Sequence, residues 1–221
     1  MARPNRPRGV YLAYTVQALI LLAAASSVLA GEYFLGFAAA VAFLLATTPA
    51  LMARNLHLHL PWEINLLIAV SFYLHVMGHV GGYYVTLAPC YDKLAHLIAS
   101  ATVGLVAFFI ALFAEHRGDI RLTGGAIIVF ILTATLAAGV IWEVYEFTVD
   151  QVLGTNLQFG NADTMSDLIA DLVGGTIAAV FAAIILARGG EDRFIRPFTE
   201  PPHDARSTEI MGEPIDPARN R

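Results

Sequence analysis

Six long stretches of the chain contain almost only apolar residues and are separated by short polar connections. A helix that crosses the hydrocarbon core of a bilayer, roughly 30 Å thick, needs about 20 such residues. Apolar residues occupy every face of these stretches, whereas a helix on a soluble protein has one apolar stripe. The pattern predicts an all-α, polytopic membrane bundle of about six transmembrane helices, over Val10–Ala30, Tyr33–Met52, Trp62–Tyr84, Lys93–Ala114, Gly124–Val149 and Thr164–Ala187.

The composition supports a membrane protein and excludes an ordinary soluble domain. Of the 221 residues, 57% are hydrophobic and 14% are charged, whereas soluble domains average about 45–50% and about 25%. Cys90 is the one cysteine, which excludes an intramolecular disulfide and disfavours a thiolate metal site. We expect the lipid bilayer as the main partner of this chain, and no nucleic acid.

The basic residues predict the orientation of the bundle. If the N-terminus is cytoplasmic, 12 of the 13 Lys and Arg residues fall inside and Lys93 alone falls outside, as the positive-inside rule favours. We therefore expect a multi-pass protein of the plasma (inner) membrane with a basic cytoplasmic N-terminus over 1–9, a transmembrane domain over 10–187 and a disordered cytoplasmic tail over 188–221. The first span also resembles a signal peptide, but its apolar run exceeds the usual length of about 7–15 residues, which favours a retained helix.

Ionisable residues lie at one depth in four of the predicted spans. They stand near the end of the third and fifth spans and near the beginning of the fourth and sixth, all within roughly 15 Å of the outer surface at 1.5 Å per residue. Ionisable residues in membrane spans usually face the bundle interior or a water-filled cavity. We therefore expect one outward-facing pocket, whose candidate residues are His75, His79, Asp92, Lys93, His96, Glu143, Glu146, Asp163, Asp167 and Asp171.

The charge balance of this pocket indicates a cation site. Counting Asp150, which could instead be a solvated loop residue, seven carboxylates face three histidines and one lysine. Such an excess of negative charge in a low-dielectric setting must be relieved by protons or by bound cations. Oxygen and imidazole ligands suit Mg²⁺, Mn²⁺, Zn²⁺ or Fe²⁺. We expect a divalent metal ion held by Asp92, His96, Glu143 and Asp171.

Structural roles compete for some of these residues. Asp163 and Thr164 stand where a helix N-cap is expected, and Thr164-x-x-Asp167 fits a capping box. His79, flanked by glycines, could hydrogen-bond a loosened helix end. Asp171 lies two to three turns inside the sixth span, where capping does not explain it.

The same residues form motifs that resemble a known family. The chain is similar to the YjdF-type family of small bacterial and archaeal membrane proteins in Tyr91-Asp92-Lys93-Leu94-Ala95-His96, Glu143-Val144-Tyr145-Glu146 and Asp163-Thr164-Met165-Ser166-Asp167, followed by Asp171 and Gly174-Gly175. More distantly, the Asp-Lys-x-x-His element and the late Ser-Asp and Gly-Gly helix resemble VanZ-like proteins. The likeness covers about Pro61–Ala187. It implies a membrane fold and supports these polar positions, but it implies no reaction.

Three functions of different classes stay open from the sequence. The first is a metal-dependent enzyme that acts on a lipid or lipid-linked phosphate at the outer leaflet, where the cation activates water or polarises a phosphoryl group. The second is a cation or proton transporter, because intramembrane acids and histidines form relays, although no pair of broken helices marks a transport site. The third is a non-catalytic component of the cell envelope, in which the polar layer holds helices together or senses a ligand. The sequence does not decide whether the protein is an enzyme.

Overall fold

A computed structural model of the protein describes residues 8–55, 60–118 and 120–191. Within these ranges the chain forms seven helices and no strand. The helices are α1 (Arg8–Leu29), α2 (Tyr33–Asn55), α3 (Trp62–Val80), α4 (Tyr83–Thr86), α5 (Cys90–His116), α6 (Gly124–Leu153) and α7 (Asn161–Ala187). Most of the predicted N-terminal segment and of the predicted tail lies outside the described residues.

Six of these helices are long and apolar enough to cross a membrane, and α4 is the exception. The shortest of the six, α3, has 19 residues, which corresponds to roughly 28 Å of helix. Large apolar side chains such as Leu22, Phe37 and Ile141 are exposed on the outside of the bundle, where lipid would cover them. The predicted all-α architecture with six spans is therefore confirmed.

The third span is shorter than predicted. Helix α3 ends at Val80 and not at Tyr84, because Gly82 adopts a left-handed conformation with φ of 69°, which favours glycine. The single turn α4 then folds back, so that the Tyr84 ring packs against Gly78, where an added Cβ would collide with it. Helices α5 and α7 begin about one turn earlier than predicted, and α6 ends about one turn later. Helices can continue past the hydrocarbon core with polar residues.

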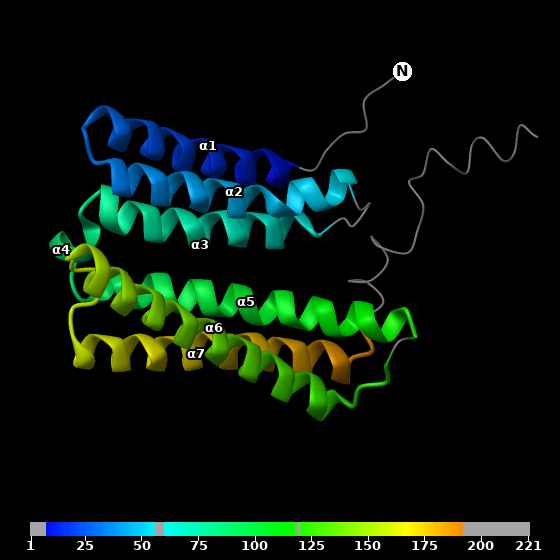
Figure 1. Ribbon diagram of the computed structural model, residues 1–221. Coiled ribbons are helices and arrows are strands. Elements are labelled where there is room, and N and C mark those ends of the chain that lie inside the picture. The colour runs from blue at the N-terminus through cyan, green and yellow to red at the C-terminus, as the bar shows by residue number, and fades with distance from the viewer. Residues whose placement is uncertain (1–7, 56–59, 119, 192–221) are drawn as a thin grey trace, which may run out of the picture.

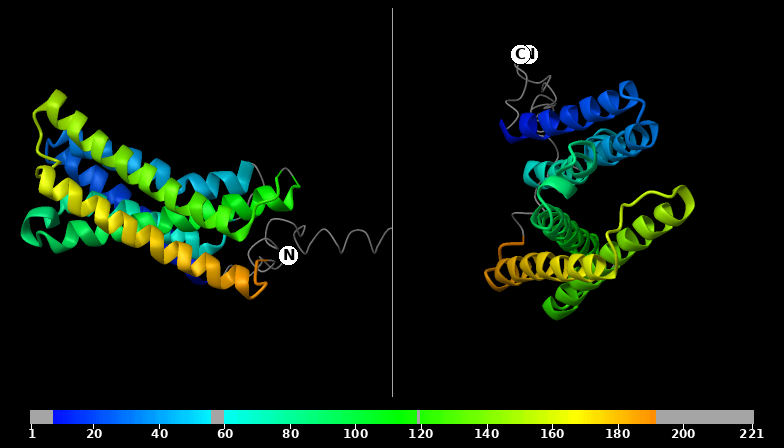
Figure 2. Two further views of the ribbon diagram at one scale, coloured as in Figure 1. Left: turned by 90° about the horizontal axis from the view of Figure 1, so that it is seen from below. Right: turned by 90° about the vertical axis from the view of Figure 1, so that its left-hand side faces the viewer.

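The long helices form two groups of three (Figure 1). Helices α1, α2 and α3 pack on one another, as do α5, α6 and α7, and the pair α3–α5 joins the two groups. Helix α6 runs obliquely to α7 (Figures 1 and 2). Among the described residues, the backbone of α6 does not come close to that of α2 or α3, and α6 meets α3 through side chains, since the Trp142 ring lies 4.5 Å from the His75 ring.

The two halves of the second group differ in polarity. Toward the α5–α6 connection, Phe108, Leu112, Ile127 and Ile131 form a buried apolar core. At the other end, α3 and α6 end and α5 and α7 begin next to α4 (Figure 1). We call this the α4 end. The ionisable residues of four helices, namely α3, α5, α6 and α7, lie at the α4 end.

Candidate metal centre

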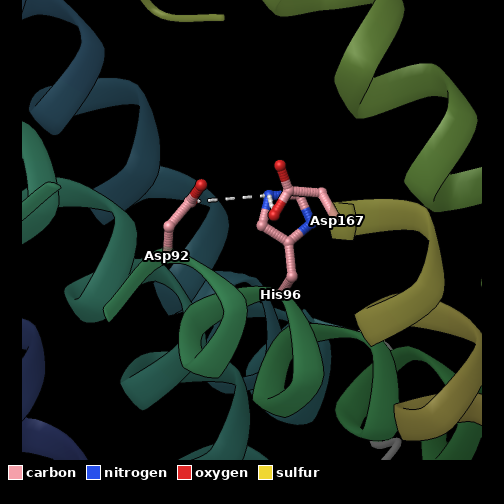
Figure 3. A group of neighbouring side chains, drawn as sticks. All are labelled: Asp92, His96 and Asp167. Carbon is pink, nitrogen blue, oxygen red and sulfur yellow. Dashed lines mark ion pairs between the residues drawn. The ribbon is translucent and has the colours of Figure 1, made fainter. Parts of the chain in front are cut away.

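His96 lies at the centre of a cluster of carboxylates at the α4 end. Its Nε2 atom lies 3.8 Å from one oxygen of each of three residues: Asp92, one turn earlier on α5, Glu143 on α6 and Asp167 on α7. The Asp92 side chain is 14% exposed and the other three are nearly fully buried. Figure 3 shows Asp92 and Asp167 approaching the imidazole ring from two different helices. One imidazole nitrogen therefore faces carboxylates from three helices.

The other ring nitrogen of His96 is held by Asp171. Nδ1 lies 3.2 Å from Asp171 Oδ1, and Ser100 donates its hydroxyl to the same oxygen at 2.5 Å. Because a carboxylate oxygen accepts, the proton of a neutral His96 ring belongs on Nδ1. Nε2 then presents its lone pair to the three other carboxylates. A histidine that binds a metal is usually oriented in this way, by a carboxylate on its second nitrogen.

Two buried carboxylates near His96 have unpaired oxygens. Glu143 is 5% exposed, and neither of its oxygens has a hydrogen-bond partner of normal geometry, although the Thr164 side chain lies nearby. Asp171 Oδ2 is also buried without a partner, and it packs against Gly139 of α6 so closely that a Cβ there would collide with it. A buried charged group without partners costs more than about 1–3 kcal/mol. These oxygens therefore favour a nearby cation or a proton.

Lys93 neutralises only part of the negative charge. Its Nζ atom lies 2.6 Å from Asp163 Oδ1, 2.7 Å from Asp167 Oδ1 and 3.1 Å from Asp92 Oδ2. Even if His96 is protonated, two positive charges face the six carboxylates that surround His96 and Lys93, with Asp150 of the described residues at the α4 end left out of this count. The six are Asp92, Glu143, Glu146, Asp163, Asp167 and Asp171. The remaining negative charge favours the binding of a divalent cation.

Aromatic and imidazole rings from α3, α4 and α6 border this cluster. The His75 ring lies 5.5 Å from the His96 ring and 4.5 Å from the Trp142 ring, and its Nδ1 lies 2.6 Å from the Tyr84 hydroxyl. Burial raises the pKa of Tyr84, so the phenol stays neutral, and the His75 tautomer decides which of the two groups donates this hydrogen bond. The His79 ring packs edge-on against Tyr84. The structure thus places both α3 histidines beside the cluster, in contact with aromatic side chains.

Two acids near the end of α6 have local partners. Trp142 donates its ring N–H to Glu146 at 2.9 Å, within the same helix. Asp150 accepts hydrogen bonds from the Thr155 hydroxyl and from the backbone N–H groups of Leu157 and Gln158. Asp150 therefore organises the α6–α7 connection and is not merely a solvated loop residue.

The capping role considered for Asp163 and Asp167 is wrong. Gly160 occupies the N-cap of α7 without a side-chain cap hydrogen bond, because the helix begins one turn earlier than predicted. The two aspartates contact Lys93 instead. Thr164 accepts a hydrogen bond from the Gln158 side chain at 2.7 Å.

One set of ligand atoms is compact enough for a single ion. Atoms of Asp92, His96 and Asp167 all lie within 4.8 Å of one another. Ligand atoms about 2.1 Å from a common ion lie roughly 3.4 Å apart in a tetrahedral site, so small side-chain movements would close the site. Of the four predicted ligands, Asp92 and His96 belong to this group, Glu143 borders it, and Asp171 lies on the opposite side of the ring. The choice of ligands stays a prediction.

Sequence reasoning missed several residues of this site. Ser100 stands four residues after His96, the same spacing that relates Asp92 to His96, so helical periodicity could have identified it. Gly139, Trp142 and Tyr84 reach the cluster only through packing between helices. No pattern along the chain indicates that packing.

The fold and the site together define an integral membrane protein with a buried acidic and histidine-containing cluster at one end. Residues 11–188 match the family described as "Predicted membrane protein (DUF2238)", and the chain belongs to this family. An uncharacterized protein of Thermotoga maritima is 33% identical over 129 residues, which are 58% of this chain and 65% of that protein. The chain thus spans slightly less than two thirds of that relative. No solved structure matches.

Proposed function

We propose that this protein binds a divalent cation through His96 Nε2, Asp92 and Asp167, in a pocket on the outer side of the plasma membrane. One observation supports this above all: a single imidazole nitrogen lies 3.8 Å from three carboxylate oxygens of different helical turns. In this proposal Asp171 is a positioning residue, because it fixes the ring through the other nitrogen. A hard or borderline ion such as Mg²⁺, Mn²⁺, Zn²⁺ or Fe²⁺ suits these ligands.

The reaction that suits this site best is hydrolysis of a phosphate ester on a lipid or lipid-linked substrate. A bound divalent ion polarises a phosphoryl oxygen and lowers the pKa of a bound water. Glu143, whose oxygens are buried and unpaired, would take the proton of that water as general base. Water would then attack phosphorus, the ester P–O bond would break, and the leaving oxygen would receive the proton that Glu143 has taken up. Lys93 already contacts three carboxylates, so the cation would bind the phosphate.

The packing of the opposite half disfavours a transporter. A relay of protons or cations needs polar groups across the membrane. In the described part of α5, α6 and α7, the half beyond the site is filled by the apolar core around Phe108, Leu112 and Ile131. A polar site that is accessible from one side of the membrane suits an enzyme or a sensor better than a transporter. The resemblance to YjdF-type and VanZ-like proteins supports the choice of Asp92, His96 and the α7 aspartates, and supports no particular reaction.

Pulsed electron paramagnetic resonance of Mn²⁺ added to the detergent-solubilised protein tests the proposed ligation. A directly bound imidazole gives a nitrogen coupling on the Mn²⁺ signal. We expect this coupling in the wild type and in His75→Gln, whose ring lies beside His96 but outside the ligand group. His96→Gln should lack it. Bound Mn²⁺ without nitrogen coupling in the wild type, or no bound Mn²⁺ at all, would contradict the proposal.

A further inference from the structure

A large apolar groove runs along the outside of the bundle beside the candidate metal centre. It has a volume of about 450 Å³ and lies between α2, α3 and α6, where its walls include Phe37, Ala42, Leu45, Val76 and Tyr145. Binding sites for small ligands typically measure about 300–1,000 Å³. The groove is therefore large enough for a molecule, and its walls favour an apolar one.

The groove opens sideways, toward the lipid that would surround the bundle. Phe37 is 68% exposed and Leu45 is 49% exposed, although both line the groove. Its three helices are all candidate membrane spans, and in the described residues the backbone of α6 stays apart from those of α2 and α3. A hydrocarbon chain could thus enter from the bilayer without crossing water.

The groove shares a wall with a second, mainly apolar cavity, which lies on the Asp171 side of the His96 ring and is not lined by Asp92 or Asp167. This cavity of about 260 Å³ reaches His96, Ser100 and Asp171. Three side chains line both spaces, namely Phe72, His75 and Trp142. The His75 and Trp142 rings lie 4.5 Å apart, so these side chains form the layer between the groove and the cavity that His96 and Asp171 line.

We propose that this groove holds the hydrocarbon tail of a membrane lipid whose phosphate headgroup lies at the Asp92–His96–Asp167 centre. This inference rests on the proposed function, because only a bound cation makes the acidic cluster attractive to a phosphate. A lipid fits both spaces, since its tail suits the groove and its anionic head suits a divalent ion held by oxygen and nitrogen ligands. A soluble phosphate ester has no hydrocarbon tail and would not occupy the groove. The substrate class of the site is therefore a phospholipid or another lipid phosphate.

Photocrosslinking of the whole chain in detergent micelles tests the tail site. The probe is phosphatidic acid with a diazirine near the end of one acyl chain, and mass spectrometry maps the labelled residues. We expect saturable labelling on the groove faces of α2, α3 and α6. Ala42→Trp fills the groove and should lower this labelling several-fold, as should Ala38→Phe. Leu44→Trp changes an exposed residue of the same helix outside the groove and should leave labelling unchanged.

A second experiment distinguishes the contribution of the phosphate headgroup to binding from that of the hydrocarbon tail. Chelator should weaken labelling by phosphatidic acid several-fold and should leave labelling by a diacylglycerol with the same photoreactive chain unchanged. Even labelling over all exposed faces of the wild type, or equal labelling in Ala42→Trp and Leu44→Trp with unchanged melting temperatures, would overturn the tail site. Mn²⁺ spectra of the same samples show whether the metal centre fails as well, because Mn²⁺ ligation by His96 does not depend on the groove.

Discussion

The Asp171 carboxylate and the His96 imidazole meet at 3.2 Å although the two residues are 75 positions apart in the chain. This contact fixes the His96 ring, and it leaves Nε2 toward Asp92, Glu143 and Asp167. The pair joins α5 to α7, the two helices that supply the compact ligand group. In the proposed metal site, Asp171 would therefore orient His96 and would not itself bind the ion.

Asp171→Asn tests this positioning role. The amide keeps the size of the side chain but is a weaker acceptor for Nδ1–H, so the variant should fold and its divalent-cation affinity should fall about 10–100-fold. Calorimetric titration with Mn²⁺ measures the loss. If Asp171 instead serves a structural ion pair, its removal should cost about 3–5 kcal/mol of unfolding free energy. The melting temperature would then fall equally with chelator and with metal.

Gly139→Ala tests whether α6 must approach Asp171 closely. The new Cβ would collide with the Asp171 carboxylate, and overpacking of this kind costs about 1–3 kcal/mol. We expect a lower melting temperature and weaker metal binding. Gly125→Ala is the matched control, because a Cβ there has 4.0 Å to its nearest neighbour, the Thr123 hydroxyl. Equal melting temperatures for the two variants would show that Gly139 is not needed for this contact.

Lys93→Gln tests the charge balance. Lys93 contacts Asp92, Asp163 and Asp167, and its removal leaves these carboxylates facing one another. The metal-free protein should melt at a lower temperature, by an amount that corresponds to less than the about 3–5 kcal/mol of a fully buried pair, because the Lys93 side chain is 23% exposed. A divalent cation should restore most of this loss, because it replaces the missing positive charge. A loss that added Mg²⁺, Mn²⁺ or Zn²⁺ does not change would count against a cation site at this position.

The orientation of the bundle is tested by reporter fusions. If both termini are cytoplasmic, a reporter that is active only outside the membrane should be silent after Arg221. The same reporter inserted near Gly154, which ends α6 at the α4 end, should be active. The reverse pattern would place the acidic cluster on the cytoplasmic side.

The sequence predicts that the polar residues stand near the helix ends next to α4, because the spans are long and their bounds can be read from the apolar pattern. It does not predict how each helix is rotated about its axis. Asp167 and Asp171 lie one turn apart on the same stripe, yet Asp167 faces Nε2 and Asp171 faces Nδ1. Only the packing of α5 against α7 decides between them. The sequence also predicts the end of α3 too late in the chain. The aromatic residues after Gly82 continue the apolar pattern, although the backbone turns at this glycine.

Elemental analysis of the purified, detergent-solubilised protein tests the central claim most directly. Asp167→Asn and Asp163→Asn each remove one charge and one close contact to Lys93, at 2.7 Å and 2.6 Å. Of the two aspartates, only Asp167 belongs to the ligand group around His96. We predict about one divalent ion per chain in the wild type and in Asp163→Asn, and a large loss in Asp167→Asn. A wild type that purifies without a divalent ion and takes up none on titration, or an equal ion content in the two variants, would contradict the metal centre.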